Sequence, residues 1–89
     1  MRAIVTVIGK DHVGIIAGVC SILLEYQVNI LDISQTVLQE YLTMVMLVDI
    51  SACTLKFGDL ASILKERGEA EELSIRIQRE DIFEAMHRI

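Results

Sequence analysis

The chain has 89 residues, the length of one small domain, and 53% of them are apolar. This apolar share is more than one small core easily buries, so we expect a homodimer or a larger homo-oligomer that covers the remainder. Thirteen acidic residues against eight basic ones give a net charge of −5. Because no cluster of lysines or arginines interrupts this balance, the composition argues against nucleic acid as a direct ligand.

The cysteines and the apolar runs predict a cytoplasmic chain. Cys20 and Cys53 lie far apart within apolar stretches, where we interpret them as small buried hydrophobic residues in a reducing compartment. The longest uncharged run, residues 13–24, is too short to span a bilayer, and the apolar segment after Arg2 ends at Lys10 without a convincing cleavage site. We therefore expect neither export nor membrane insertion.

The first half of the chain predicts a strand, a helix and a hairpin. No proline, low-complexity tract or charge run marks a linker, so residues 1–89 are expected to form one domain. Residues 3–8 are rich in β-branched side chains, and residues 14–27 then carry apolar side chains at helical spacing. Residues 28–39 and 42–51 are extended segments around the polar pair Glu40 and Tyr41, which suits a tight turn. The alternation of the first segment changes phase, which predicts a bulge or a bend.

The second half predicts another helix and another strand. Residues 55–67 carry an apolar stripe, and Gly68 is placed to end this helix in the left-handed conformation. Residues 73–78 alternate cleanly between apolar and polar side chains, as a half-buried strand does. Asp81 is a candidate cap for a last short helix that carries Ile82, Phe83 and Met86.

The predicted fold class is α+β. The order β-α-β-β-α-β is that of the ferredoxin-like sandwich: an antiparallel four-stranded sheet with two helices on one face, here followed by the short C-terminal helix. In this topology the first and third strands are central, yet both are apolar on both faces. Either the C-terminal helix or another subunit must cover the second face, and the excess of apolar residues favours the subunit.

The turn between the first strand and the first helix, in the stretch VIGKDHVGIIAG (residues 7–18), is the candidate binding site. Gly9 and Gly14 have the spacing of a nucleotide phosphate loop, but Ile15 and Ile16 stand where lysine and a hydroxyl residue are required. No cofactor is therefore expected. Gly14 leaves the first backbone amides of the helix uncrowded, and such amides attract a carboxylate or another small anion.

Asp11 and Asn29 each have two possible roles. Asp11 either caps the first helix or accepts hydrogen bonds from a ligand ammonium group. Asn29 is either a turn residue or a ligand-binding amide, and we expect it near the same end of the sheet as the loop. An acid, free amides and an amide side chain together favour an amino-acid zwitterion over a sugar or a phosphate.

The stretch GKDHVGIIAGVCSILLEYQVNILDIS resembles the ACT domain, through Asp11, Gly14 and the sequence Val28-Asn29-Ile30. With ISQTVLQEYLTM and IFEAMHRI, the whole chain, residues 1–89, resembles the free-standing single-ACT-domain proteins of bacteria and archaea. The resemblance implies two domains that pair side by side and bind an amino acid between them. The site that it implies contains the following residues, the last two from the same or the neighbouring subunit: Asp11, His12, Val13, Gly14, Ile15, Asn29 and Ile30.

Other functions have weaker support. Cys20 lies about two helical turns from His12 and no acid orients the pair, so we expect no enzyme. His87 lacks a metal-ligand spacing, so no metal site is expected. An RNA-recognition motif needs aromatic residues on the first and third strands, which contain none except Tyr41 at the hairpin. A ligand-free module that regulates a partner enzyme or transcription factor by contact remains the alternative to the amino-acid-binding regulatory domain.

Overall fold

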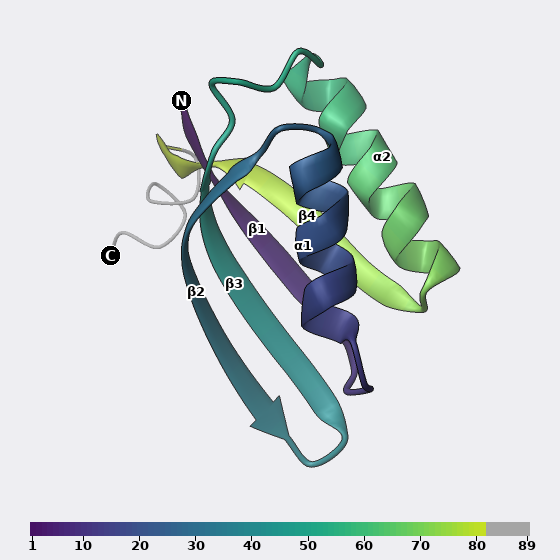
Figure 1. The fold of residues 1–89 in the computed structure, drawn as a ribbon. Helices are drawn as coiled ribbons and strands as arrows, with labels where there is room; N and C mark the ends of the chain where they lie inside the picture. Colours follow the sequence, from purple (N-terminus) through teal and green to yellow (C-terminus); the bar gives the residue numbers. More distant parts are fainter. Residues whose placement is uncertain (82–89) are drawn as a thin grey trace.

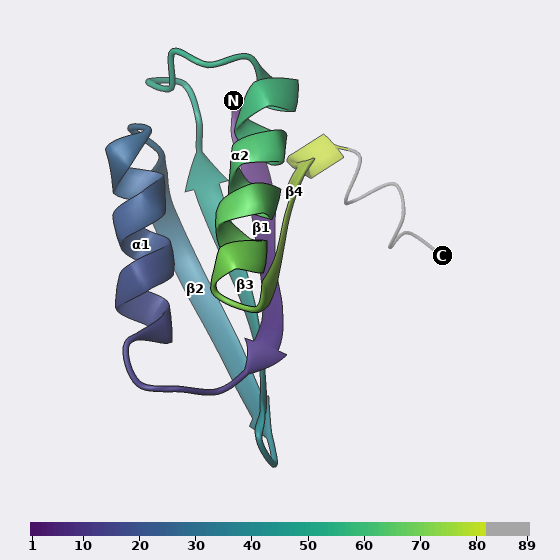
Figure 2. The same cartoon turned by 90° about the vertical axis from the view of Figure 1, so that its right-hand side faces the viewer.

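The computed structural model describes residues 1–81, and these form six elements in the predicted order. The strands pair antiparallel in the order β2-β3-β1-β4, and both helices cover one face of the sheet (Figures 1 and 2). The ferredoxin-like prediction, with its first and third strands central, is confirmed, whereas most of the predicted C-terminal helix lies outside the described residues. The elements are β1 (Arg2–Lys10), α1 (Ile15–Glu25), β2 (Asn29–Leu38), β3 (Tyr41–Asp49), α2 (Phe57–Ala70) and β4 (Leu73–Arg79).

The core lies between the sheet and the two helices. Alternate residues of the central strands point at the helices, and Val5, Val7, Met44 and Met46 are completely buried there. Burying one side chain of this size stabilises the fold by about 1.5–3 kcal/mol. No polar or charged residue is buried among residues 1–81. The polar chemistry of the described chain is therefore confined to loops, edges and the rims of surface hollows.

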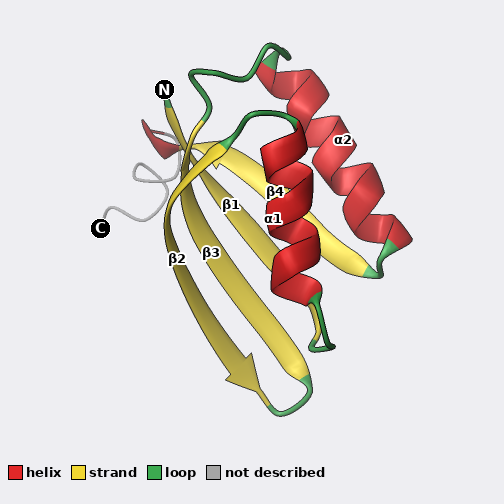
Figure 3. Ribbon diagram, in the orientation of Figure 1, coloured by secondary structure: helices red, strands yellow, loops and turns green. Residues whose placement is uncertain are grey.

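The opposite face of the sheet has an apolar centre with polar flanks. Ile4, Val45 and Leu47 are half-buried there, while Asp32 on β2 and Arg76 on β4 lie toward the two edges. Neither α1 nor α2 covers this face (Figure 3). That the C-terminal helix or a second subunit covers this face stays a prediction.

The hairpin of β2 and β3 has the predicted turn and bulge. Gln39 adopts the left-handed conformation with φ 55° in the turn, and the register of β2 against β3 shifts between Ile30 and Asp32. The end of the hairpin reaches past the start of α1 (Figure 1). For this reason Leu38 is 74% exposed although it belongs to a regular strand pair.

The prediction that Gly68 ends α2 in the left-handed conformation is wrong. The helix continues to Ala70, and Glu72 is the residue with positive φ, at 60°. Gly68 is instead a buried helical residue at which α2 approaches β4. A Cβ atom there would lie 2.8 Å from Cγ1 of Ile75 and 3.0 Å from the carbonyl oxygen of Leu73. The glycine is needed for close packing and not for its freedom of φ.

We predict that Gly68→Ala lowers the free energy of unfolding by about 1 kcal/mol. Overpacking at Ile75 costs about 1–3 kcal/mol, which exceeds the gain of up to about 1 kcal/mol in helix propensity. Urea denaturation at a fixed protein concentration measures the change. Gly58→Ala is the matched control, since a Cβ atom at Gly58 meets nothing within 4 Å. If both variants are equally stabilised, α2 does not approach β4 as closely as described.

Candidate functional site

The loop between β1 and α1 is held at one end of the sheet by its backbone. The N–H of Asp11 donates a hydrogen bond of 2.7 Å to the carbonyl oxygen of Glu40 in the β2–β3 turn. The side chains of Asp11, His12 and Val13 are all exposed. Nδ1 of His12 lies 3.2 Å from the carbonyl oxygen of Val13. The loop is therefore fixed to the hairpin while its side chains stay accessible to a ligand.

The N-terminus of α1 has no side-chain cap. Gly14 occupies the cap position with φ 84°, and no side-chain hydrogen bond is made there. Asp11 therefore does not cap α1, which was one of the two roles predicted for it. The N–H of Ile15 lies 3.4 Å from the carbonyl oxygen of His12, and the next amides, of Ile16 and Ala17, have no partner within the helix. The positive end of the α1 dipole is thus open to an anion.

A cleft of about 460 Å³ extends from this loop along the space between α1 and α2. Four of the predicted site residues line it: His12, Val13, Gly14 and Ile15. Small residues of α1, Gly14, Gly18 and Ser21, form part of its wall and leave space there. A Cβ atom at Gly14 or at Gly18 would meet nothing within 4 Å. The remaining lining residues are Gly18, Val19, Ser21, Ile22, Arg67, Glu71, Leu73 and Ile75.

Arg67 on α2 is the cationic residue of this cleft that sequence reasoning missed. Its guanidinium Nη1 lies 2.5 Å from Oε2 of Glu25, so an ion pair joins the two helices. Hydrogen bonds to Glu25 and to Tyr26 raise the pKa of Arg67 above its ordinary value. The spacing of Gly14, Gly18 and Ser21 could have revealed a small-residue face on α1. No pattern in the sequence marks Arg67 or Glu71.

Asn29 and Ile30 lie at the other end of the sheet, so the expectation that Asn29 comes close to the loop within one chain is wrong. Asn29 pairs with Asp49, which pairs with Arg2 at the start of β1, whereas the loop follows Lys10 at the end of β1. The physical reason is that α1, with eleven residues, spans about 16 Å between the two positions. Asn29 is exposed, and Ile30 packs against the core.

Asn29 is next to a small polar cluster. The N–H of Ser51 donates a hydrogen bond of 2.8 Å to Oδ1 of Asp49, and the N-terminal ammonium group lies 3.6 Å from the same oxygen. The pKa of Asp49 is lowered below its ordinary value, mainly by the hydrogen bonds from Ser51 and less by the nearby ammonium charge. This end of the sheet therefore presents an ionised carboxylate beside the Asn29 amide.

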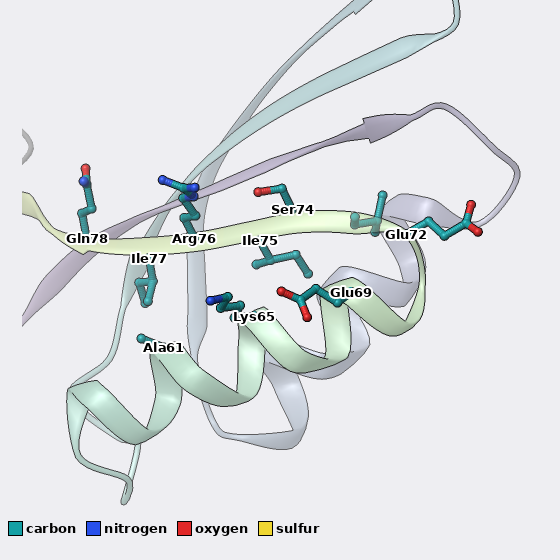
Figure 4. Close-up of a pocket in the computed structure, with 10 residues that line it drawn as sticks. Ala61, Lys65, Glu69, Glu72, Ser74, Ile75, Arg76, Ile77 and Gln78 are labelled. Carbon is teal, nitrogen blue, oxygen red and sulfur yellow. The ribbon is translucent and has the colours of Figure 1, made fainter.

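A second hollow, of about 600 Å³, runs between α2 and the free edge of β4. In Figure 4, Ile75 and Ile77 point toward α2, while Ser74, Arg76 and Gln78 lie on the other side of the strand. Lys65 and Glu69 extend from α2 beneath the strand (Figure 4). None of the predicted site residues lines this groove, so we place the candidate site at the α1–α2 cleft.

Two kinds of feature are absent from residues 1–81. No three His, Cys, Asp or Glu side chains come together there in a way that could hold a metal ion. Within the same residues, neither helix is long and apolar enough to cross a membrane.

Comparison with known proteins identifies the family. The model of the ACT domain matches residues 2–78. The UPF0237 protein of Clostridium acetobutylicum is 56% identical over 89 residues, 100% of both chains. An ACT domain protein from Streptococcus pneumoniae superposes with a TM-score of 0.83 at 46% identity, over 98% of each chain.

A more distant likeness shows the fold alone. The regulatory subunit of aspartate kinase from Thermus thermophilus, in its ligand-free form, is 22% identical with a TM-score of 0.65, over 86% of this chain and 50% of that one.

Because the family model spans most of the chain and the Clostridium protein matches it from end to end, the chain belongs to the ACT domain family, whose members are in general regulatory, ligand-binding domains.

Proposed function

We propose that this chain is a non-enzymatic regulatory domain that binds an amino acid or a related metabolite at the loop of residues 11–15, where two copies meet. The observation that carries the proposal is the uncapped start of α1, which opens directly into a cleft of about 460 Å³. Cavities of this size, apolar with a few polar groups, are typical ligand sites. The regulatory name of the aspartate kinase neighbour agrees with this class of function.

The groups around the loop complement a zwitterion. The amides of Ile16 and Ala17 at the start of α1 offer hydrogen bonds and a positive dipole to a carboxylate. The exposed carboxylate of Asp11, which caps no helix, is available to an ammonium group. His12 adds an imidazole at the mouth of the cleft. An amino acid carries both charges on one small molecule and fits this pair of groups.

A second copy at the β2 edge brings Asn29 to the loop. Among the described residues, β2 has one hydrogen-bonded neighbour, β3, and a free edge of ten residues. Such an edge is a template for another strand. If two copies join these edges antiparallel about a two-fold axis, the Asn29 end of one strand lies beside the hairpin end of the other, to which the Asp11 loop is bonded. Asn29 and Ile30 of the second copy then complete the site.

Apolar residues line the route along which the copies would meet. Ile16, Cys20 and Leu24 lie on the side of α1 away from the cleft, which is the side of the free β2 edge. Leu24 is 76% exposed, and Ile33 and Val37 on β2 are exposed as well. Pairing of the edges would remove these side chains from water, which accounts for part of the apolar excess of the sequence.

We predict that Ile33→Lys converts the assembly to monomers. The change places a charge at the proposed strand-to-strand contact, as natural free edges do to prevent pairing. Light scattering over a dilution series measures the mass of wild type and variant. Ile8→Lys is the matched control, because Ile8 is 49% exposed on the uncovered face of the sheet and Ile33 is 39% exposed. If Ile8→Lys dissociates the assembly and Ile33→Lys does not, the copies meet through the sheet face instead.

We predict that a screen of the common amino acids by thermal shift finds one or two that stabilise the protein, by about 2.7 kcal/mol at a hundred times the dissociation constant. Asn29→Ala and Asp11→Asn should each lower the affinity for the stabilising amino acid by about tenfold or more. Each variant removes one charge-assisted or buried hydrogen bond to the ligand. Asp59→Asn removes an exposed carboxylate at the start of α2, away from β2 and from the cleft, and should leave binding unchanged.

A flat response to every amino acid would contradict the proposal. It would favour the ligand-free module that acts by protein contact, for which the apolar centre of the uncovered sheet face is the candidate surface. If an amino acid binds but Asn29→Ala has no effect, the site belongs to one chain and not to two.

A further inference from the structure

The antiparallel helices place opposite dipole ends at the mouth of the α1–α2 cleft, next to the loop. α1 begins at Ile15, directly after the loop. α2 ends at Ala70 on the same side, because Leu73, three residues later, pairs with Gly9 near the end of β1 (Figures 1 and 2). A helix carries a partial positive charge at its start and a partial negative charge at its end. The mouth therefore has a positive wall on α1 and a negative wall on α2.

Glu71 adds a full charge to the negative wall. It occupies the C-cap position of α2, is exposed, and lines the cleft together with His12, Val13 and Gly14. Within residues 1–81 its carboxylate makes no ion pair. A carboxylate at the negative end of a helix is unfavourable alone, so it gains from a cation. Since Asp11 does not line the cleft, Glu71 is the carboxylate that a cationic group meets inside the mouth.

Beyond the mouth, the buried lining of the cleft is aliphatic. Its members come from α1 and from the first half of β4: Ile15, Val19, Ile22, Leu73 and Ile75. A Cβ atom at Gly18 would meet nothing within 4 Å, so space is open beside these side chains. Between Ile15 and Ile22 the helix rises about 10 Å, which accommodates an amino acid with an extended side chain.

Arg67 bounds the end of the cleft away from the loop and is already paired there. Its Nη1 atom lies 2.5 Å from Oε2 of Glu25, the last residue of α1. A carboxylate on a ligand side chain could reach the guanidinium group only in competition with Glu25, and an ammonium group would be repelled by it. An aliphatic side chain needs no partner and gains free energy by leaving water.

We propose that the ligand binds with its ammonium group on Glu71 and its side chain inside the α1–α2 cleft, and that the preferred class is an α-amino acid with an aliphatic side chain. The proposal rests on the proposed function, which places the ligand carboxylate at the start of α1. The carboxylate then faces the positive wall of the mouth and the ammonium group the negative wall. An ammonium group has three donors, so it can bond to Glu71 and to the loop together.

Titration calorimetry on the full chain tests the role of Glu71 with two ligands. These are L-leucine and its keto acid, which has the same side chain and carboxylate but a ketone in place of the ammonium group. Glu71→Gln should weaken leucine binding by about tenfold and leave the keto acid unchanged, because only leucine carries the cation. Glu72→Gln is the matched control: Glu72 is the next exposed carboxylate and does not line this cleft. Equal weakening of leucine by both variants would reduce Glu71 to general surface charge and overturn its role.

A second set of ligands tests the cleft. The wild type should bind L-leucine about tenfold or more tighter than L-alanine, L-glutamate or L-lysine. Gly18→Leu fills the cleft on a helical backbone, so it should weaken leucine and leave alanine unchanged. Retained alanine binding shows that the variant is folded. Gly58→Leu is the control, since Gly58 lies in open space on α2 and does not line the cleft.

The outcomes separate this proposal from the proposed function. Losses specific to leucine in Glu71→Gln and in Gly18→Leu support it. If the wild type binds an amino acid that Asp11→Asn weakens, yet Glu71→Gln and Gly18→Leu leave affinity and preference unchanged, the cleft is overturned as the side-chain site and the proposed function stands. If the wild type binds none of the common amino acids, both are overturned.

Discussion

The packing of two helices on one face of an antiparallel sheet is the constraint on which the rest of this structure depends. It requires alternate residues of β1 and β3 to be apolar, and Val5, Val7, Met44 and Met46 are completely buried as a result. Since no polar or charged side chain is buried among residues 1–81, side-chain recognition can only take place where the layers end. Three such places exist in the described chain: the space between the helices, the free strand edges and the uncovered sheet face.

The two helices meet the sheet in different ways, and the difference leaves room for a site. α2 lies close to β4 because Gly68 has no side chain where Ile75 passes. α1 presents Gly14, Gly18 and Ser21 toward α2, so the two helices do not interdigitate along this side. Glycine within a helix weakens it by roughly 0.5–1 kcal/mol relative to alanine. The fold thus keeps a less stable helix and an uncapped helix start at a hollow that borders the loop.

The elements could be predicted from sequence because each depends on local periodicity. β4 follows from the alternation of residues 73–78, and α1 follows from the helical stripe of residues 14–27. The bulge of β2 follows from the phase change in residues 28–39. The role of Gly68 could not be predicted, because glycine at the end of a helix pattern has the same appearance whether it supplies positive φ or close packing. The left-handed residue is Glu72, a type that seldom adopts this conformation.

The site was harder to predict than the fold, because it combines residues that no local pattern connects. The loop was found from Gly14 and the residues around it, which share one turn of chain. The sequence predicts Asn29 at the wrong end of the sheet, because the length of α1 separates it from the loop. Arg67 and Glu71 reach the cleft only through the packing of α2 beside α1, and in the sequence they are two of many charges near a helix end.

The position of the loop also explains how binding could be transmitted. The same residue that is proposed to hold the ligand ammonium group, Asp11, is bonded through its N–H to Glu40 in the turn that joins β2 to β3. β2 is in turn the edge proposed to join the second copy. Under the proposed function, a ligand at the loop acts on the assembly edge through this backbone hydrogen bond and through the hairpin that contains β2. Because linkage is reciprocal, the free energy by which the ligand stabilises the paired edges equals the free energy that ligand binding gains when the edges pair. A small regulatory domain can in this way convert the concentration of a metabolite into a change of quaternary structure.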